Sequence, residues 1–208
     1  MKGGFFASSN VVFMVERPMR WHGFTDHESY IASVEVVDNH VSLVLDDSEH
    51  CFTAQQCAEV TKSLARVMLT YSRLGACQGS AESISQSKAY ASWCQLIQAR
   101  TLSTERDLLQ TFESEKKGFE FCASGSFRCP KSHPGEPIYY KLAIALDDDL
   151  DLPCLSIDGR IFPLNFDEAF WLVEQLWVAG YLVAQTEQSS NSTVKMPWIN
   201  DEGQLMWM

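Results

Sequence analysis

The chain has 208 residues, which is long enough for one sizeable hydrophobic core or for two small lobes. Hydrophobic residues make up 46% of it, and 12 Phe, 6 Trp and 6 Tyr exclude an intrinsically disordered chain. The net charge is −11, and the longest basic cluster is Lys116-Lys117, so we expect no direct binding to nucleic acid or to an anionic membrane.

The cellular location is also constrained by composition. No apolar run approaches the roughly 20 residues that span a bilayer, and residues 1–18 lack a continuous apolar stretch followed by a small-residue cleavage site. The seven cysteines are odd in number, and several occupy apolar positions, where a free thiol behaves as a small hydrophobe. The sequence therefore predicts a cytoplasmic protein.

The first 75 residues are typical of several strands followed by one helix. Strands are expected at 10–18, 30–37, 41–45 and 50–52. Thr53 with Gln56 has the spacing of a capping box, so a helix is expected to begin there and to end at Gly75. Its apolar face is predicted to be Cys57, Val60, Leu64, Val67, Met68, Tyr71 and Leu74, and its solvent face Gln55, Glu59, Lys62, Ser63 and Arg66.

The middle of the chain predicts a helical hairpin and then an edge strand. Residues 81–100 have a helix-friendly composition, and Thr104 with Asp107 could cap a second helix that includes Phe112. Residues 118–129 alternate between polar and apolar side chains, which indicates an edge strand or a hairpin.

The second half repeats the pattern of the first. Strands are expected at 139–146 and 154–157, Asp158-Gly159 is a strong hairpin signal, and a helix should run to about Gln185. A shift of 112 positions aligns the hairpin and the helix start without a gap, placing Asp46 on Asp158, Thr53 on Asn165, Gln56 on Glu168 and Leu64 on Leu176. The predicted fold class is α+β, with two antiparallel β-β-β-α units that form a weak internal repeat. A helical insertion separates them, and an approximate two-fold axis would place their helices side by side.

Four parts are expected along the chain. They are the N-terminal unit at 1–75, the helical insertion at 76–118, the C-terminal unit at 119–187, and a linker with an apolar hairpin at 188–208. That hairpin carries Trp198, Ile199, Leu205, Met206, Trp207 and Met208. Because terminal residues fray unless they are tied down, this tail either closes over the core or anchors a partner protein.

The helix of the C-terminal unit is apolar on more than one face. The residues concerned are Ala169, Phe170, Leu172, Val173, Leu176, Trp177, Tyr181, Leu182 and Val183. A helix that is apolar nearly all round must be buried nearly all round. It is therefore expected to be either the central helix of the fold or part of a subunit interface.

An unusual density of carboxylates occurs at DDDLDLPC, which holds Asp147, Asp148, Asp149 and Asp151. We interpret this segment as an acidic turn, because aspartate side chains hydrogen-bond nearby backbone amides and the first unit has a turn at the same place. A divalent-cation site using Asp147–Asp149 and Asp158 is the alternative, although such a site usually draws further ligands from elsewhere. An acidic docking epitope is the third interpretation.

Other polar groupings give weaker signals. Cys122, Cys129 and His133 are too widely spaced for a typical zinc site, and no fourth ligand is evident. His22 and His27 flank a loop that also contains Asp26, which is the best remaining polar cluster, but a solvated loop is the simpler explanation. No dinucleotide, phosphate-loop, nucleophile-elbow, zinc-protease or EF-hand motif occurs, so no cofactor or metal is expected and the chain is not expected to be an enzyme.

These observations predict an acidic protein that binds another protein as an inhibitor or adaptor. The expected partner is basic and possesses, for example, a nucleic-acid-handling surface, where carboxylates would compete with phosphates for Arg and Lys. The expected contacts are the acidic turns, Asp46, Asp47, Glu49, Asp147, Asp148, Asp149 and Asp151, and the apolar side chains Phe170, Trp177, Tyr181, Trp198, Met206 and Trp207. A metal-dependent hydrolase and a structural homo-oligomer, for instance a homodimer, are the alternatives.

Overall fold

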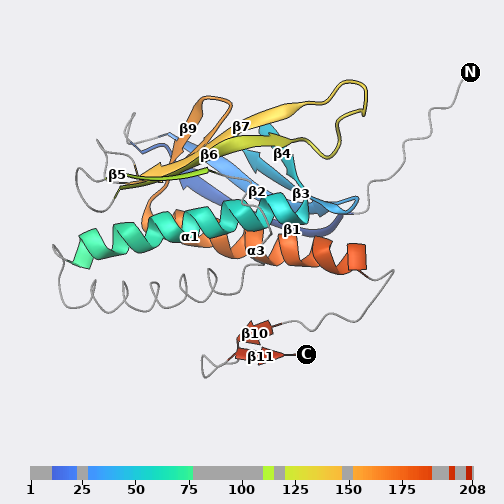
Figure 1. The fold of residues 1–208 in the computed structure, drawn as a ribbon. Coiled ribbons are helices and arrows are strands. Elements are labelled where there is room, and N and C mark those ends of the chain that lie inside the picture. The colour runs from blue at the N-terminus through green and yellow to red at the C-terminus, as the bar shows by residue number, and fades with distance from the viewer. Residues whose placement is uncertain are drawn as a thin grey trace, which may run out of the picture.

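The computed structural model describes residues 11–22, 28–76, 110–114, 120–146, 152–188, 197–199 and 205–207. The N-terminal elements form an antiparallel sheet in the order β1-β2-β3-β4, here called sheet A, and a long helix follows it (Figure 1). Their bounds are β1 Val11–Arg20, β2 Ser29–Val37, β3 His40–Leu45, β4 Ser48–Phe52 and α1 Ala54–Ala76.

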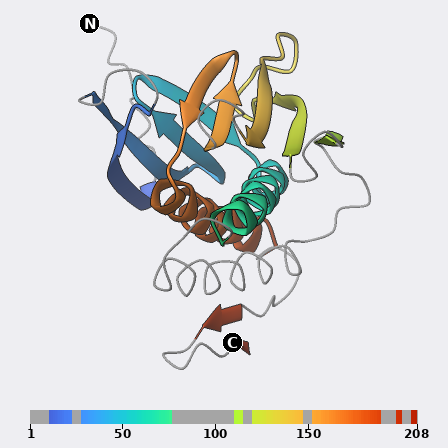
Figure 2. The same ribbon diagram turned by 90° about the vertical axis from the view of Figure 1, so that its left-hand side faces the viewer.

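The C-terminal elements repeat this arrangement. Sheet B is antiparallel in the order β5-β6-β7-β8-β9, and a second long helix follows it. The bounds are β5 Gln110–Ser114, β6 Glu120–Arg128, β7 Tyr139–Leu146, β8 Pro153–Ile157, β9 Arg160–Pro163 and α3 Phe166–Gln188. A small antiparallel pair, β10 Pro197–Ile199 and β11 Leu205–Trp207, lies on the side of the helices away from the sheets (Figures 1 and 2).

Tight turns join the strands where the sequence predicts them. Asp38 and Asn39 both have positive φ angles, 46° and 64°, between β2 and β3. Asp46 and Asp158 adopt φ angles of 59° and 52° at the equivalent turns of the two sheets, and Gly159 follows at 83°. Asp and Asn tolerate this left-handed region better than most residues. Turns with positive φ angles match the twist of the two strands of a hairpin.

Both helices begin with the predicted capping box. The Gln56 backbone N donates to Thr53 Oγ1 at 3.2 Å, and Thr53 N donates to Gln56 Oε1 at 2.9 Å. Glu168 N and Asn165 N make the reciprocal pair of bonds in α3, each at 2.9 Å. Backbone donors that a helix start leaves without intrahelical partners are satisfied in this way.

Each helix packs mainly on the sheet of the other unit. Helix α1 contacts β6, β7 and β8 more extensively than its own sheet, whereas α3 contacts β1, β2 and β3. The two helices lie side by side under the sheets (Figure 2). They run antiparallel (Figure 1), and they meet where Cys57 Sγ donates to Leu176 O at 3.1 Å and Cys57 adjoins Gly180.

Equivalent contacts relate the two units by an approximate two-fold axis. Asp46 N donates to Ile31 O at 3.0 Å, and Asp158 N donates to Lys141 O at 2.7 Å. Ala32 lies opposite Leu45 as Leu142 lies opposite Ile157, so Tyr30 and Tyr140 are equivalent. These strands in turn align β1 with β6, because Met19 pairs with Tyr30 and Phe127 pairs with Tyr140.

The predicted α+β fold with two antiparallel units is confirmed, and the differences from the prediction concern Phe112 and the solvent face of α1. The strands expected at 10–18 and within 118–129 are present as β1 and β6, and each is a further strand in the sheet of its unit. Phe112 lies on strand β5 and not on a helix. In α1, Glu59 and Ser63 are buried, and only Gln55 of the predicted solvent face is exposed, because α1 is packed between both sheets and α3. Residues 77–109, most of the predicted helical insertion, lie outside the described residues.

One hydrophobic core fills the space between the helices and the inner faces of both sheets. Phe52, Phe127 and Phe162 are fully buried within it, and Phe52 meets Phe127 edge-on at 6.0 Å between ring centroids. Because both units contribute to this core, neither sheet has a separate hydrophobic interior.

Candidate functional site

The acidic turn of β3 and β4 is paired within the molecule. The Arg160 guanidinium, at the equivalent hairpin of sheet B, forms ion pairs with Asp46 and Asp47 and donates to Ser48 Oγ at 2.9 Å. Its hydrogen bond and positive charge hold the pKa of Asp47 below the usual range. Asp46 and Asp47 remain partly exposed, but both carboxylates are already paired with the Arg160 guanidinium.

An aromatic cluster lies under the Arg160 guanidinium. The guanidinium carbon is 5.7 Å from the Trp21 ring centroid and 5.5 Å from that of Phe162, within the range of cation–π contacts. Tyr30 completes the cluster, with its ring centroid 4.6 Å from that of Trp21. Burial is the main reason that the pKa of Tyr30 is raised, so this phenol stays protonated and is no candidate base.

Glu168 joins the start of α3 to the end of β1. Its Oε2 lies 2.7 Å from His22 Nε2, and its Oε1 accepts a hydrogen bond from Arg20 N at 2.9 Å. The equivalent residue Gln56 donates from Nε2 to Arg128 O at 2.9 Å, so both capping-box side chains bind the other unit. Of the predicted His22–Asp26–His27 cluster, only His22 is described, because residues 23–27 lie outside the described part of the chain.

Glu49 is also engaged in internal bonds. Its Oε1 accepts from Lys131 Nζ at 2.9 Å and from Ser42 Oγ at 2.9 Å, and the Lys131 bond is the first reason that its pKa is lowered. Cys51 Sγ lies 3.4 Å from the same oxygen, and burial raises the pKa of this thiol to about 11. A thiol with so high a pKa is a poor nucleophile at neutral pH.

Of the residues predicted for the alternative divalent-cation site, the structure describes Asp158 alone. Asp147, Asp148, Asp149 and Asp151 lie outside the described residues. Asp158 Oδ1 accepts a hydrogen bond from Lys141 N at 2.7 Å, which is the role of a hairpin aspartate. Within the described ranges, no group of His, Cys, Asp and Glu side chains could hold a metal ion.

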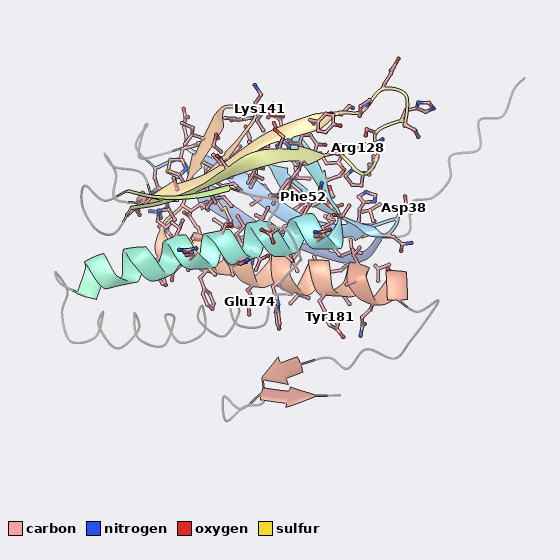
Figure 3. All side chains as sticks on the ribbon, in the orientation of Figure 1. Asp38, Phe52, Arg128, Lys141, Glu174 and Tyr181 are labelled. Atoms are coloured by element: carbon pink, nitrogen blue, oxygen red, sulfur yellow. The ribbon has the colours of Figure 1, made fainter. Side chains whose placement is uncertain are left out.

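The predicted apolar contacts on α3, Phe170, Trp177 and Tyr181, are half-buried. None of the side chains from Glu168 to Gln185 is exposed, and Phe170 packs against the core. Tyr181 points away from the sheets (Figure 3) and accepts a hydrogen bond from Gln185 Nε2 at 2.6 Å. In the C-terminal hairpin, Trp198 pairs with Met206 and Pro197 with Trp207, but the side chains there lie outside the described part.

A mixed apolar and acidic patch, which the sequence patterns did not reveal, lies on the outer face of sheet A. We define this sheet A patch as Met14, Glu16, Pro18, Ile31 and Glu35. Met14 is 52% exposed and lies opposite Glu35, while Ile31 is 51% exposed and lies opposite Pro18. The sequence did contain a signal for this patch. Residues 10–18 and 30–37 have apolar side chains on both faces of their strands, although one face of such a sheet must meet solvent.

The outer face of sheet B has a different chemistry. Ser124, Ser126 and Ser156 line a shallow depression of about 360 Å³ there, next to Lys141. Lys141 and Arg128 are both exposed on this side of the molecule (Figure 3). Tyr139 and Ile161 are also exposed on this face, at 56% and 50%. The described residues thus combine apolar side chains with two glutamates and Arg20 on sheet A, and with basic and serine side chains on sheet B.

Comparison with models of known protein families, with curated proteins and with solved structures gave no match. Neither α1 nor α3, the helices of the described part, is apolar enough over its length to cross a membrane.

Proposed function

We propose that the protein acts by binding another protein, as an inhibitor or adaptor, and that the sheet A patch is its contact surface. The observation that carries this proposal is the pair Met14 and Ile31, two large apolar side chains about half exposed on one sheet face. Apolar side chains grouped among polar ones on a sheet surface are a common feature of protein interfaces.

The charge of the patch favours a basic partner. Glu16 and Glu35 belong to the patch, and the Asp46-Asp47 turn adjoins it, since Asp46 N bonds to Ile31 O. Asp46 and Asp47 outnumber Arg160, so the turn keeps a negative charge after its internal pairing. Carboxylates around an apolar centre would steer a basic surface to it, and this attraction would weaken with added salt.

The proposal places the protein in the cytoplasm. Cys51, Cys57 and Cys129 are buried and free, as expected of thiols in a reducing compartment.

The test is affinity capture from the native cell extract at low and high salt, with Ile31→Lys and Ile138→Lys as matched variants. Ile138 is 56% exposed and precedes β7 in sheet B, so it offers the same change away from the patch. We expect Ile31→Lys to reduce the captured partner at least about tenfold, because a buried unpaired lysine costs more than about 1.4 kcal/mol. Ile138→Lys should capture as much as the unsubstituted protein.

Equal capture by both variants would show that the sheet A patch is not the contact surface. A partner retained undiminished at high salt would contradict the basic-partner part of the proposal, since exposed charge pairs are screened.

A further inference from the structure

Among the described strands, sheet B has one more than sheet A, and that extra strand, β5, lies at the edge of sheet B. Strand β5 pairs with the first half of β6, from Ser114 opposite Glu120 to Gln110 opposite Ser124. By the two-fold relation between the units, the equivalent half of β1 is Val12–Glu16. In sheet A, β1 is the edge strand, and β2 is its one neighbour among the described strands (Figure 2, dark blue at the left).

At this edge, the backbone of β1 is paired with no other strand of the described residues. Trp21 N donates to Glu28 O at 2.9 Å, and the register with β2 is continuous from Phe13 to Arg20. In this part of β1 the odd-numbered residues therefore bond to β2, and the even-numbered ones direct their backbone N–H and C=O groups to the open side. The same alternation holds in β6, where Cys129 N donates to Ile138 O at 2.8 Å. It directs the backbone N–H and C=O groups of Cys122 and Ser124 to β5. Pro18, which has no N–H, occupies an even position of β1, as expected at an edge.

Charged residues and proline, which protect edge strands, lie in one half of β1, and the other half has a register shift in its pairing with β2 between Val11 and Phe13. Glu16, Arg17, Pro18 and Arg20 lie in the second half, and charges and proline discourage pairing. The first half, Val11–Val15, is wholly apolar, and Val11, Val12 and Met14 are exposed at 50%, 68% and 52%. Such a segment is a ready template for another strand.

We infer that the partner of the proposed function supplies an extended strand that pairs with β1 along Val12–Glu16, in the position that β5 occupies on β6. This inference rests on the proposed function and specifies its mode of binding, which is strand addition to sheet A.

The side chains of β1 define the chemistry of the added strand. On the inner side it would lie beside Phe13 and Val15, which are half-buried against the core, so its inward residues are apolar. On the outer side it would lie beside Met14 and Glu16, so a lysine or arginine there would pair with Glu16. A second copy of this chain fits less well, because each copy carries a net charge of −11.

The probe is a short synthetic peptide, acetylated and amidated at its ends, that alternates valine and lysine. Its binding to the full chain is followed by amide hydrogen exchange and chemical shifts in NMR. We expect the peptide to slow exchange of the Met14 and Glu16 amides, whose N–H groups face the open edge, and to leave that of Val15 unchanged. A peptide of the same composition with N-methyl groups on alternate residues should not bind.

Two variants separate backbone pairing from charge. Glu16→Pro and Glu16→Gln both remove the carboxylate, but only Glu16→Pro removes an outward N–H, a loss that Pro18 shows the strand tolerates. Glu16→Pro should bind the peptide about tenfold more weakly than Glu16→Gln. The reason is that Glu16→Pro loses one backbone hydrogen bond to the peptide and weakens the strand pairing next to it. A cooperative thermal transition in each variant verifies the fold.

The outcomes distinguish this inference from the proposed function. Equal binding by the two variants overturns strand addition, and if Ile31→Lys still abolishes partner capture the proposed function stands. Met14 and Glu16 amides that already exchange slowly in the free monomer would show that the chain fills this edge itself. A dimer of the peptide-free protein that dissociates in Glu16→Pro would show that the occupant is a second copy. Either result contradicts the inference.

Discussion

His50 and Phe162 occupy equivalent positions in the two units, and each packs against a tyrosine of the other. The Phe162 ring lies 5.7 Å from that of Tyr30, and the His50 ring meets Tyr140 edge-on at 5.2 Å. His50 is 7% exposed, and its Nδ1 has no hydrogen-bond partner among the described residues. A phenylalanine in the equivalent place shows that this packing requires only an aromatic ring.

Replacing His50 by phenylalanine should stabilise the protein and flatten its pH dependence. Burial is the main cause of the lowered pKa of His50, so the unfolded chain takes up the proton first as the pH falls below about 6.5. The free energy of unfolding therefore decreases from pH 7 to pH 5 in the unsubstituted protein. His50→Phe should remove this part of the decrease and add about 1 kcal/mol at pH 7 by eliminating a buried unpaired nitrogen.

Urea denaturation across this pH range measures the effect. His40, whose pKa is also lowered by burial, should keep a residual slope in the variant. An unchanged slope in His50→Phe would mean that His50 is protonated equally in the folded and unfolded states.

At the scale of elements, the crossing of α1 and α3 depends on a small residue. A Cβ placed on Gly180 would lie 3.2 Å from Cys57 Cβ, so the helix backbones approach closely there. Gly180→Val should therefore cost about 1–3 kcal/mol by overpacking. Ala184→Val on the same helix, where the side chain is only half-buried, controls for the lower helix propensity of valine.

Equilibrium denaturation of both variants by circular dichroism gives the comparison. Equal losses would indicate that propensity explains the effect and that the helices do not meet at Gly180.

Much of the local structure could be predicted because it depends on neighbouring residues. The Thr53–Gln56 and Asn165–Glu168 capping boxes and the Asp158-Gly159 turn form from side chains a few positions apart. The exchange of helices between sheets could not be predicted, because a helical pattern shows which face is buried but not which sheet covers it. For the same reason the predicted solvent face of α1 was wrong at Glu59.

The candidate site was predicted less well than the fold. The turn at Asp46 and Asp47 was expected, but its pairing with Arg160, and that of Glu49 with Lys131, joins residues about 80 to 115 positions apart, which no local pattern reveals. The exposed Ile31 resembles a core residue of its alternating strand until the register with Pro18 places it on the outer face.

At the scale of the whole molecule, the exchanged helices should make unfolding a single event. Leu64 in α1 and Leu176 in α3 are both fully buried in the common core. Leu64→Ala and Leu176→Ala should each lower the free energy of unfolding by about 2–5 kcal/mol and shift one shared transition. Tryptophan fluorescence and far-ultraviolet circular dichroism should coincide in both variants, whereas two separated transitions would show that the units fold independently.

The measurement that tests the central claim most directly is site-specific photo-crosslinking in the native cell. A photoreactive phenylalanine derivative is introduced in place of Ile31 in one variant and of Ile138 in another, two isoleucines of similar exposure, 51% and 56%. We expect a discrete crosslinked protein with a basic surface from position 31 and none from position 138. Crosslinks of equal yield from both positions, or from position 138 alone, would contradict the proposed contact surface.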